Sequence, residues 1–307
     1  MPENSGKIRA AYKLRALRRE KNTKLKEELL RYCEGPLEAG RTLAELLPSL
    51  VPPAAPCALP RQVWMYWHDG WDNAPEIAKL CLQSWRQRNP GYEIRTLDYA
   101  SLGSVLDDPP QHKDASKLSG FANRVRLRLL RIHGGIWADA TNFCTRPVDG
   151  WIHEHAAPAH FFAYVLPNAE RPIATWFLAA RPRAPMVVAW EEIVSLYFAR
   201  IEAEERKVHA YFYMPYIFEF AVLRNPQLRA QWDAMPKVPV GDTGRVSLLA
   251  GLQQPGAATS LAPAKREKIA ALLAGTPMQK LTWKGQMREN TPVALELLDM
   301  LRENLAG

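Results

Sequence analysis

The sequence predicts an α/β fold built on one mostly parallel sheet. Apolar strand patterns and amphipathic helix patterns alternate between residues 62 and 141, and this alternation favours strands that run in parallel. One helix pattern ends at Gly134-Gly135 and is followed by a short apolar run at 136–138, which is typical of a buried strand. The chain has 307 residues, 47% of them apolar, and can bury the core of one such domain.

Positive charge is concentrated near the start of the chain. Ten Lys or Arg residues between positions 7 and 31 face three Glu residues, so this segment holds most of the formal net charge of +8. We predict a charged helix, or a pair of helices, that ends near residues 33–36. The pattern is typical either of a solvated helix or of a basic surface attracted to anionic lipid head groups. Nucleic-acid binding is disfavoured, because only Tyr12 and Tyr32 offer aromatic stacking.

A proline-rich segment separates this basic region from the rest of the chain. A short helix is expected at 42–47, and residues 48–60 are predicted to form a connector. We therefore divide the chain into a basic helical extension with its connector, 1–60, and a main domain, 61–307. In the main domain the apolar patterns predict strands at 63–67 and 92–97, with a helix at 75–88 between them.

Beyond residue 141 the apolar pattern is less regular. We expect a strand at 160–166, a long helix at 185–204, and another helix or buried segment at 211–223. Helices at 265–273 and 292–305 close the chain, the second with Thr291 as its N-cap.

The helix expected at 116–133 contains a charge in an unusual place. With about 100° of rotation per residue, one face is apolar, and Arg124, Arg128 and Arg131 form a solvated stripe on the opposite side. Arg126 falls among the apolar residues, where a guanidinium is stable only when it is paired or bound to an anion or a hydroxylated ligand. The apolar face consists of Leu118, Ala122, Val125, Leu129 and His133.

Asp139 directly follows the apolar run at 136–138 and is therefore predicted at the carboxyl end of a strand. Ligands of open α/β sheets bind at this edge. An aspartate there can reach a metal, a ribose or a diphosphate, and the alternative is a simple turn cap. Arg126 on the preceding helix favours the functional interpretation.

Cysteine use and hydropathy favour a cytoplasmic protein, at most peripheral on the inner face of the cell membrane. Cys33, Cys57, Cys81 and Cys144 are scattered without a C-x-x-C pair, which is typical of reduced and mostly buried thiols. No apolar run approaches the length of a membrane span, and the first residues lack the apolar region of a secretory signal.

The His153-Glu154-His155 segment suggests a zinc site only superficially. It has no third ligand at a metalloenzyme spacing, and we expect it in a loop or at an exposed edge. The sequence also has no Ser-His-Asp order, phosphate-binding glycine loop or dinucleotide fingerprint, which disfavours hydrolase, kinase and dehydrogenase chemistry.

Two groups of motifs carry a family resemblance. The first is GFANRVR at 120–126 in the helix, then Gly134-Gly135, the apolar strand and DAT at 139–141. The second is VWMYWHDG at 63–70, a helix containing Ser84-Trp85, and NPGYE at 89–93. In order and spacing these motifs resemble those of bacterial capsular polysaccharide synthesis proteins. They also resemble the wider group of DXD sugar transferases, related to the glycosyltransferase sugar-binding-region (family 32-like) enzymes. The resemblance covers residues 61–147 and reappears at 279–284.

The resemblance implies a glycosyltransferase-A-like single domain with a Rossmann-like sheet. It also implies transfer of a hexose from a nucleotide sugar, a UDP-sugar, to a surface or capsular polysaccharide acceptor, with a lipid-linked acceptor as one form. Retention of the anomeric configuration is expected. In the relatives the departing diphosphate takes the acceptor's proton, and no covalent enzyme nucleophile is needed.

The matched motifs also imply roles for single residues. Trp67 matches the tryptophan that stacks on uracil in the toxin relatives, and its alternative role is a core aromatic. Asp139 matches the first aspartate of the DXD motif, and Arg126 matches an arginine that contacts the sugar or diphosphate, so we expect both in catalysis. Asn123 stands where relatives bind the donor sugar with an aspartate, and Thr141 replaces the second aspartate of the motif.

Cations are expected beside the leaving diphosphate. The resemblance implies a divalent ion, Mn²⁺ or Mg²⁺, held by Asp139 and Thr141. Lys280, Trp283 and Lys284 lie in a segment that resembles the family's site-closing region, and all three are predicted to bind the donor. The two lysines would contact its diphosphate, unless they form only a charged strand edge.

A second hypothesis belongs to a different class of function. The uncharged Asn123 and Thr141 favour a catalytically degenerate accessory protein that binds a nucleotide sugar during polysaccharide assembly. Trp67, Arg126 and Asp139 favour the enzyme.

Overall fold

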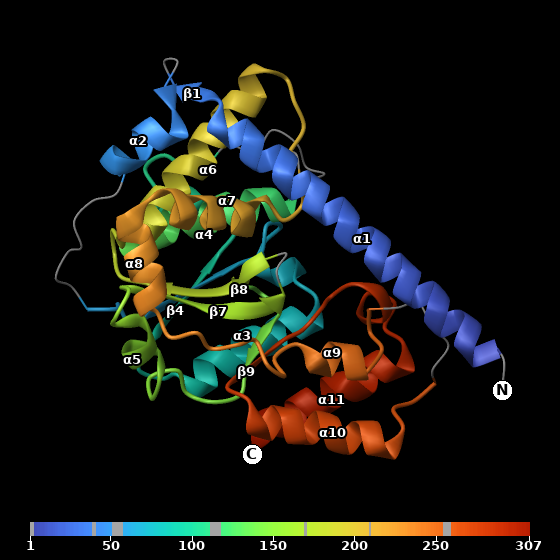
Figure 1. Ribbon diagram of the computed structural model, residues 1–307. Coiled ribbons are helices and arrows are strands. Elements are labelled where there is room, and N and C mark those ends of the chain that lie inside the picture. The colour runs from blue at the N-terminus through green and yellow to red at the C-terminus, as the bar shows by residue number, and fades with distance from the viewer. Residues whose placement is uncertain are drawn as a thin grey trace.

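The computed structural model describes residues 3–38, 41–50, 58–110, 118–168, 171–208, 210–253 and 259–307. Five strands form its central sheet, in the order β4-β3-β5-β8-β7 (Figure 1). They are β3 (Gln62–Tyr66), β4 (Glu93–Leu97), β5 (Gly135–Ala138), β7 (Phe161–Asn168) and β8 (Arg171–Ala180). The α/β prediction is confirmed, and the four strands expected from the sequence are present with small shifts at their ends.

The sheet is mixed, and its two halves differ in strand direction. β3 runs parallel to both β4 and β5, as the alternation of strands and helices predicted. β8 runs antiparallel to both β5 and β7. The parallel half holds the motifs singled out in the sequence, and the antiparallel hairpin of β7 and β8 extends the sheet beyond β5.

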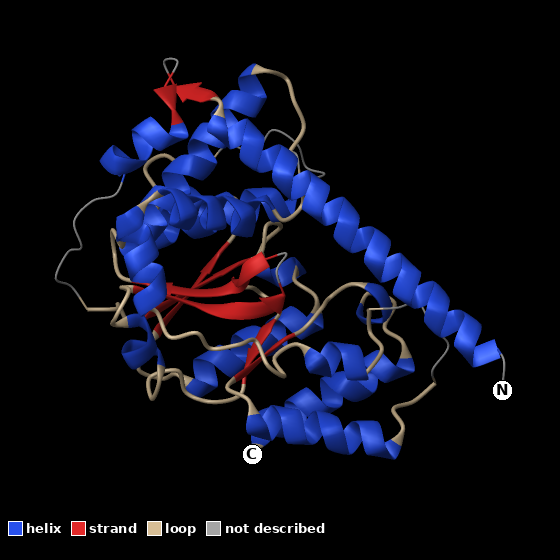
Figure 2. Cartoon of the chain, in the orientation of Figure 1, coloured by secondary structure: helices blue, strands red, loops and turns tan. Residues whose placement is uncertain are grey.

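Helices cover both faces of the sheet (Figure 2). One face packs against α4 (Leu118–His133), α6 (Pro185–Ala203) and α7 (Tyr213–Arg224), and the other against α3 (Glu76–Arg88) and α5 (Ile152–Ala156). Successive strand side chains point to opposite faces. Trp64 therefore packs in the core on the side of α4, α6 and α7, while Val63 and Met65 pack in the core on the side of α3 and α5.

A third layer packs on the outer side of α3. It contains α9 (Arg245–Leu249), α10 (Pro263–Gly275) and α11 (Pro292–Ala306), whose apolar residues form one cluster with Ile77, Leu80 and Cys81 of α3. Thr291 caps α11 as predicted, since its hydroxyl accepts from the Ala294 N–H at 3.4 Å. The small antiparallel pair of β6 (Asn142–Cys144) and β9 (Met278–Lys280) joins this C-terminal layer to the segment that follows Asp139.

The basic segment forms one helix, α1 (Glu3–Glu34), rather than a pair. Figure 1 shows its N-terminal end extending away from the other elements. Its C-terminal part packs into the core cluster of α4, α6 and α7 through Leu29, Tyr32 and Cys33. None of the helices in the described ranges is both long and apolar enough to cross a bilayer. The division of the chain at residue 60 stays a prediction.

The segment between α1 and β3 begins with the short strands β1 (Pro36–Glu38) and β2 (Arg41–Thr42) and the helix α2 (Leu43–Leu50). The short helix was predicted, but it includes Pro48, so the connector expected at 48–60 was placed too early. Residues 51–57, with Cys57, lie outside the described part of the chain. The remaining cysteines, Cys33, Cys81 and Cys144, are buried free thiols as expected.

The solvated stripe predicted on α4 is wrong. Arg128 and Arg131 face α6, where both guanidinium groups bind the carboxylate of Glu191, at 2.8 and 2.5 Å. Glu191 itself is buried. Arg124 also faces α6, where it lies 3.9 Å from Glu202. α4 is therefore covered on both sides, and its outer arginines stabilise helix packing. A helical wheel of α4 alone does not reveal this, because α6 follows more than fifty residues later.

Candidate functional site

Two glycines place the strand that carries Asp139. Gly134 and Gly135 have φ of +65° and +89°, in the region that favours glycine. A Cβ on Gly134 would lie 2.6 Å from Pro182, and one on Gly135 would lie 2.7 Å from the carbonyl oxygen of Gln62. The helix therefore turns sharply into β5 and the strand lies close against β3. Asp139 follows at the carboxyl end of β5, as predicted.

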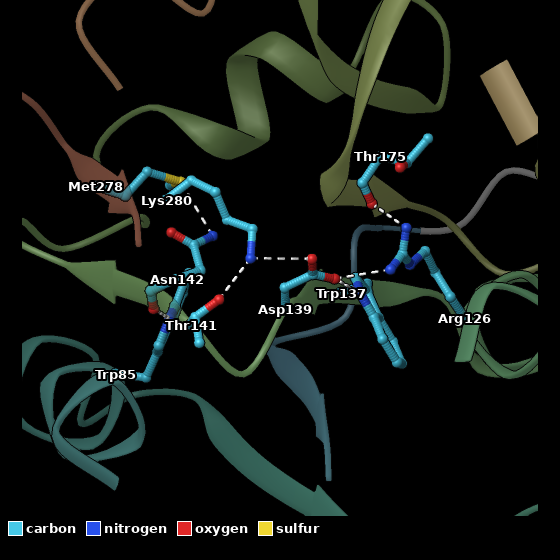
Figure 3. A network of polar contacts seen from close by, with 9 residues as sticks. All are labelled: Trp85, Arg126, Trp137, Asp139, Thr141, Asn142, Thr175, Met278 and Lys280. Atoms are coloured by element: carbon cyan, nitrogen blue, oxygen red, sulfur yellow. Dashed lines mark hydrogen bonds and ion pairs between the residues drawn. The ribbon is translucent and has the colours of Figure 1, made fainter. Parts of the chain in front are cut away.

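Asp139 lies between two positively charged side chains from distant parts of the chain (Figure 3). Its Oδ1 accepts from Arg126 Nη2 on α4 at 2.7 Å, and its Oδ2 lies 3.3 Å from Lys280 Nζ on β9. Trp137, two residues earlier on β5, donates from its indole Nε1 to the same Oδ1 at 2.9 Å. The carboxylate is thus fixed by three donors and has one orientation.

Arg126 is the buried member of this group. Its residue exposure is 4%, its Nη1 donates to the carbonyl oxygen of Thr175 at 2.5 Å, and its guanidinium lies over the ring of Trp137. The sequence predicted that this arginine needs a partner, and it has three. Because Arg126 binds Asp139 from the buried side of the carboxylate, it is suited to orienting this group.

Asp139 and Lys280 form the accessible side of the group. Their side chains are 25% and 27% exposed, so a ligand can reach both. Burial alone would raise the pKa of Asp139, but the charges of Arg126 and Lys280 outweigh this and hold the pKa below its ordinary value. The carboxyl is therefore ionised at neutral pH. Burial also lowers the pKa of Arg126, with the charge of Asp139 opposing it.

Thr141 is brought to the same point by the pairing of β6 with β9. Lys280 stands opposite Asn142 in this pair, and the Leu281 N–H donates to the Thr141 carbonyl oxygen at 2.8 Å. The Lys280 ammonium then donates to Thr141 Oγ1 at 2.5 Å while facing Asp139. The predicted residues Asp139, Thr141 and Lys280 therefore form one polar cluster.

Two tryptophans lie beside this cluster. Trp67 directly follows β3, and it packs against the small buried cluster of Ala74, Ala78 and Ala140, the last of which is the central residue of the DAT motif. Its ring centroid is 5.7 Å from that of Trp283, with the planes at 79°. Trp64, which has the opposite strand parity, is fully buried. Trp67 is therefore less deeply packed than Trp64, and its contact with a nucleotide base stays a prediction.

The remaining predicted residues lie at the margin of the cluster. Lys284 is exposed, with its Nζ 5.8 Å from the ring centroid of Trp283. Asn123, one turn before Arg126 on α4, hydrogen-bonds the hydroxyl of Tyr213 on α7. That hydroxyl also donates to the Gly120 carbonyl oxygen at 3.0 Å, and burial raises the pKa of Tyr213 to about 12.

Two contacts of the site were not anticipated. Trp137 was predicted only as a buried strand residue, although its spacing of two from Asp139 on a strand signals a side chain on the same face. The carbonyl oxygen of Thr175 has no sequence signal, because every residue has a carbonyl. Only the pairing of β5 with β8 brings this stretch of β8 beside Asp139.

The donor set does not fit a divalent cation. Within the described ranges no group of three or more His, Cys, Asp or Glu side chains could hold a metal ion. At the DAT motif Asp139 contributes one carboxylate, and its two oxygens already face Arg126 and Lys280. Mg²⁺ or Mn²⁺ takes about six oxygen ligands and would here stand between two positive side chains. The Mn²⁺ or Mg²⁺ expected at Asp139 and Thr141 does not suit these residues as they lie.

The two histidines contact protein groups around α5. His153 and His155 lie on the short helix α5, so the expected loop or exposed edge is wrong. His153 Nε2 lies 3.0 Å from the Tyr92 hydroxyl and 3.1 Å from Asp149. His155 Nδ1 lies 2.8 Å from the Trp151 carbonyl oxygen. These contacts fasten α5 to its neighbours.

Comparison with known proteins gives low-identity relatives of one kind. The chain is 27% identical over 159 residues to the O-glycosyltransferase braB of Annulohypoxylon truncatum, covering 45% of this chain and 38% of that protein. It is 23% identical over 210 residues to the putative glycosyltransferase HOC1 of Saccharomyces cerevisiae, covering 61% and 51%. The chain thus spans about half or less of the length of these relatives.

A solved structure, the PaToxG glycosyltransferase, aligns with 86% of this chain and 99% of its own at a TM-score of 0.39 and 13% identity. The family model of the capsular polysaccharide synthesis proteins matches residues 55–296. That match includes all the strands of the central sheet and every residue of the polar cluster. The chain belongs to the capsular polysaccharide synthesis protein family.

Proposed function

We propose that the protein is a glycosyltransferase that moves a hexose from a nucleotide sugar, UDP-hexose, to a surface or capsular polysaccharide. The observation that carries the proposal is the array of Arg126, Asp139 and Lys280 at the carboxyl edge of the parallel strands, beside Trp67 and Trp283. Family membership and relatives with glycosyltransferase names support the same chemistry.

Each part of the array suits one part of a nucleotide sugar. The ring of Trp67 offers a surface for the base, and the ammonium groups of Lys280 and Lys284 offer charge for the diphosphate. The accessible Asp139 carboxylate can accept hydrogen bonds from sugar or ribose hydroxyls. Asn123 has a neutral amide, which can bind sugar hydroxyls in addition to its hydrogen bond with Tyr213.

The proposed transfer retains the anomeric configuration. The bond from the anomeric carbon to the diphosphate oxygen breaks, the acceptor oxygen bonds the same carbon, and the acceptor's proton passes to the departing diphosphate. Asp139 is held by Arg126, Trp137 and Lys280 and stays in place. A fixed carboxylate stabilises charge at the reacting carbon without reorganisation.

The acceptor and the location follow from the same proposal. A surface glycan grows on a lipid-linked acceptor, and the basic residues of α1 would hold the enzyme at the anionic inner face of the cell membrane. No nucleic-acid partner is proposed.

A second candidate is a nucleotide-sugar-binding accessory protein without turnover. The observation that favours it is the absence of a carboxylate at Asn123 and Thr141, the two positions that are acidic in the DXD relatives.

Two measurements test the proposal in sequence. A ligand that binds only the folded state raises the melting temperature, so a thermal screen with nucleotides and nucleotide sugars should identify the donor class. We expect UDP or a UDP-hexose to give the largest shift. A screen in which no nucleotide shifts the melting temperature contradicts the proposal. Binding without hydrolysis or transfer on prolonged incubation supports the accessory protein.

A further inference from the structure

The place of a divalent cation at the DAT motif is taken by a side chain of the protein. Lys280 Nζ lies 3.3 Å from Asp139 Oδ2 and donates to Thr141 Oγ1 at 2.5 Å. It therefore bridges the first and third positions of the motif, which are the two positions expected to share a metal ion. Figure 3 shows the ammonium between the two side chains, on the opposite side of Asp139 from Arg126.

Strand pairing fixes the backbone position of Lys280. β9 pairs with β6 so that Lys280 faces Asn142, and the Leu281 N–H to Thr141 carbonyl bond continues the pairing. Gly244 packs against Lys280, since a Cβ there would lie 3.4 Å from the Lys280 carbonyl oxygen. Lys280 stays 27% exposed at its side chain, so the ammonium also has an open side.

We propose that Lys280 is the resident cation of the donor site and that the transferase binds and uses its nucleotide sugar without a divalent metal. This inference rests on the proposed function and adds the residue that neutralises the diphosphate. The ammonium has three N–H donors. One is used by Thr141 and one faces Asp139, and the open side receives an oxygen of the diphosphate.

The same arrangement explains why a threonine is sufficient at position 141. A second aspartate would be needed to chelate a metal ion, whereas a hydroxyl needs only one hydrogen bond and accepts it from Lys280. In the transfer step the bond to the diphosphate oxygen breaks and the acceptor's proton goes to the diphosphate. Lys280 takes no part in this proton transfer, and its ammonium group stabilises the negative charge of the leaving group.

The test measures UDP binding by calorimetry, and UDP-hexose hydrolysis, on metal-stripped protein with EDTA or with Mn²⁺. We expect wild-type affinity and rate to agree within about twofold in the two conditions. Lys280→Met should weaken UDP binding by at least about tenfold, while Lys280→Arg, which keeps the charge, retains most of it. Lys268→Met, at an exposed lysine on α10, is the matched control and should bind UDP normally.

A conversion variant makes the test sharper. Thr141→Asp combined with Lys280→Met adds a second carboxylate beside Asp139 and removes the resident cation, so UDP binding by this variant should require Mn²⁺. Wild-type protein that binds UDP only with Mn²⁺ would overturn this inference while leaving the proposed function intact. Lys280→Met that melts normally and binds UDP like the wild type would also overturn it. Failure of all nucleotides, with and without metal, removes the proposed function itself.

Discussion

Asp139 depends on neighbours that the sequence reveals unequally. Arg126 could be predicted, because a guanidinium on an apolar helix face needs an anion. Lys280 was singled out by its place in the final motif, but its contact with Thr141 arises from a strand pair between residues far apart in the chain. The Thr175 carbonyl could not be predicted. The sequence thus predicts which residues need a partner, whereas the fold determines which atoms they contact.

Replacing the central carboxylate tests its structural and chemical roles together. We expect Asp139→Asn to lower the free energy of unfolding by about 1–3 kcal/mol, because Arg126 loses its charged partner while buried. UDP-hexose turnover should fall by at least about a hundredfold. Asp233→Asn removes an exposed carboxylate paired with Arg229 and serves as the control for denaturant melts and assays. Equal turnover in both variants would contradict the assigned site.

The effect of the same variant should depend on pH. The pKa of Asp139 in the folded protein is lowered, since Arg126 and Lys280 outweigh burial. Its contribution to stability is fully present above the unfolded pKa of about 3.9 and is lost as the pH falls through the lower folded value. The difference in melting temperature between wild type and Asp139→Asn should stay constant from about pH 8 to 6 and shrink below about pH 4. A difference that grows on acidification would argue against this ion group.

At the scale of elements, the turn between α4 and β5 is the feature most fully predicted. The sequence indicated the helix, its glycine end and the strand, and each is present. The outer face of α4 was interpreted wrongly, because its arginines bind Glu191 of α6. Periodicity reports which face is apolar, but a polar face against another helix looks the same as one in water.

Gly135 should tolerate no side chain. Alanine there would combine a φ of +89° with a Cβ 2.7 Å from the Gln62 carbonyl oxygen. We expect Gly135→Ala to lose about 3 kcal/mol or more of unfolding free energy, or to fail to fold. Gly275→Ala, at the end of α10 where a Cβ meets nothing within 4 Å, should melt like the wild type. Similar urea midpoints for the two variants would refute the close approach of β5 to β3.

Glu191 should be the strongest single link between α4 and α6. It is 4% exposed and accepts from Arg128, Arg131 and Ser195. Glu191→Gln removes the buried anion that the two guanidinium groups share, and we expect a loss of about 2–4 kcal/mol in chemical denaturation. Glu192→Gln, whose side chain is 30% exposed and contacts Arg131, should lose about 1 kcal/mol or less. Equal losses would show that burial of Glu191 does not matter.

Across the whole molecule, the parallel half of the sheet was predicted, whereas the places of β8 and of the C-terminal layer were not. Strands joined by a helix imply parallel pairing, which fixes β3, β4 and β5. No comparable rule placed β8 beside β5, or the C-terminal layer against α3, because these contacts join segments distant in sequence. The site spans both regions, so Asp139 could be predicted from its own motif while its contact with Lys280 could not.

Deletions should show that α1 has two parts, a C-terminal part needed for stability and an N-terminal part needed for membrane binding. Its described core contacts include Leu29, Tyr32 and Cys33, so deletion of residues 1–34 should cost about 4 kcal/mol or more. Deletion of residues 1–18 removes five basic residues and should leave the melting temperature unchanged. Only the full chain should then sediment with anionic vesicles, and salt should release it. Equal sedimentation of the full chain and the 1–18 deletion would exclude this membrane role.

Sugar transfer at Asp139 is measured most directly by the release of UDP from UDP-hexose. Metal-stripped wild-type protein is incubated with the UDP-hexose that gives the largest thermal shift, and free UDP is quantified by chromatography. We expect steady UDP release that is unaffected by EDTA and nearly absent in Asp139→Asn, with the variant still folded. Release at the same rate from wild type and Asp139→Asn would contradict sugar transfer at this carboxylate.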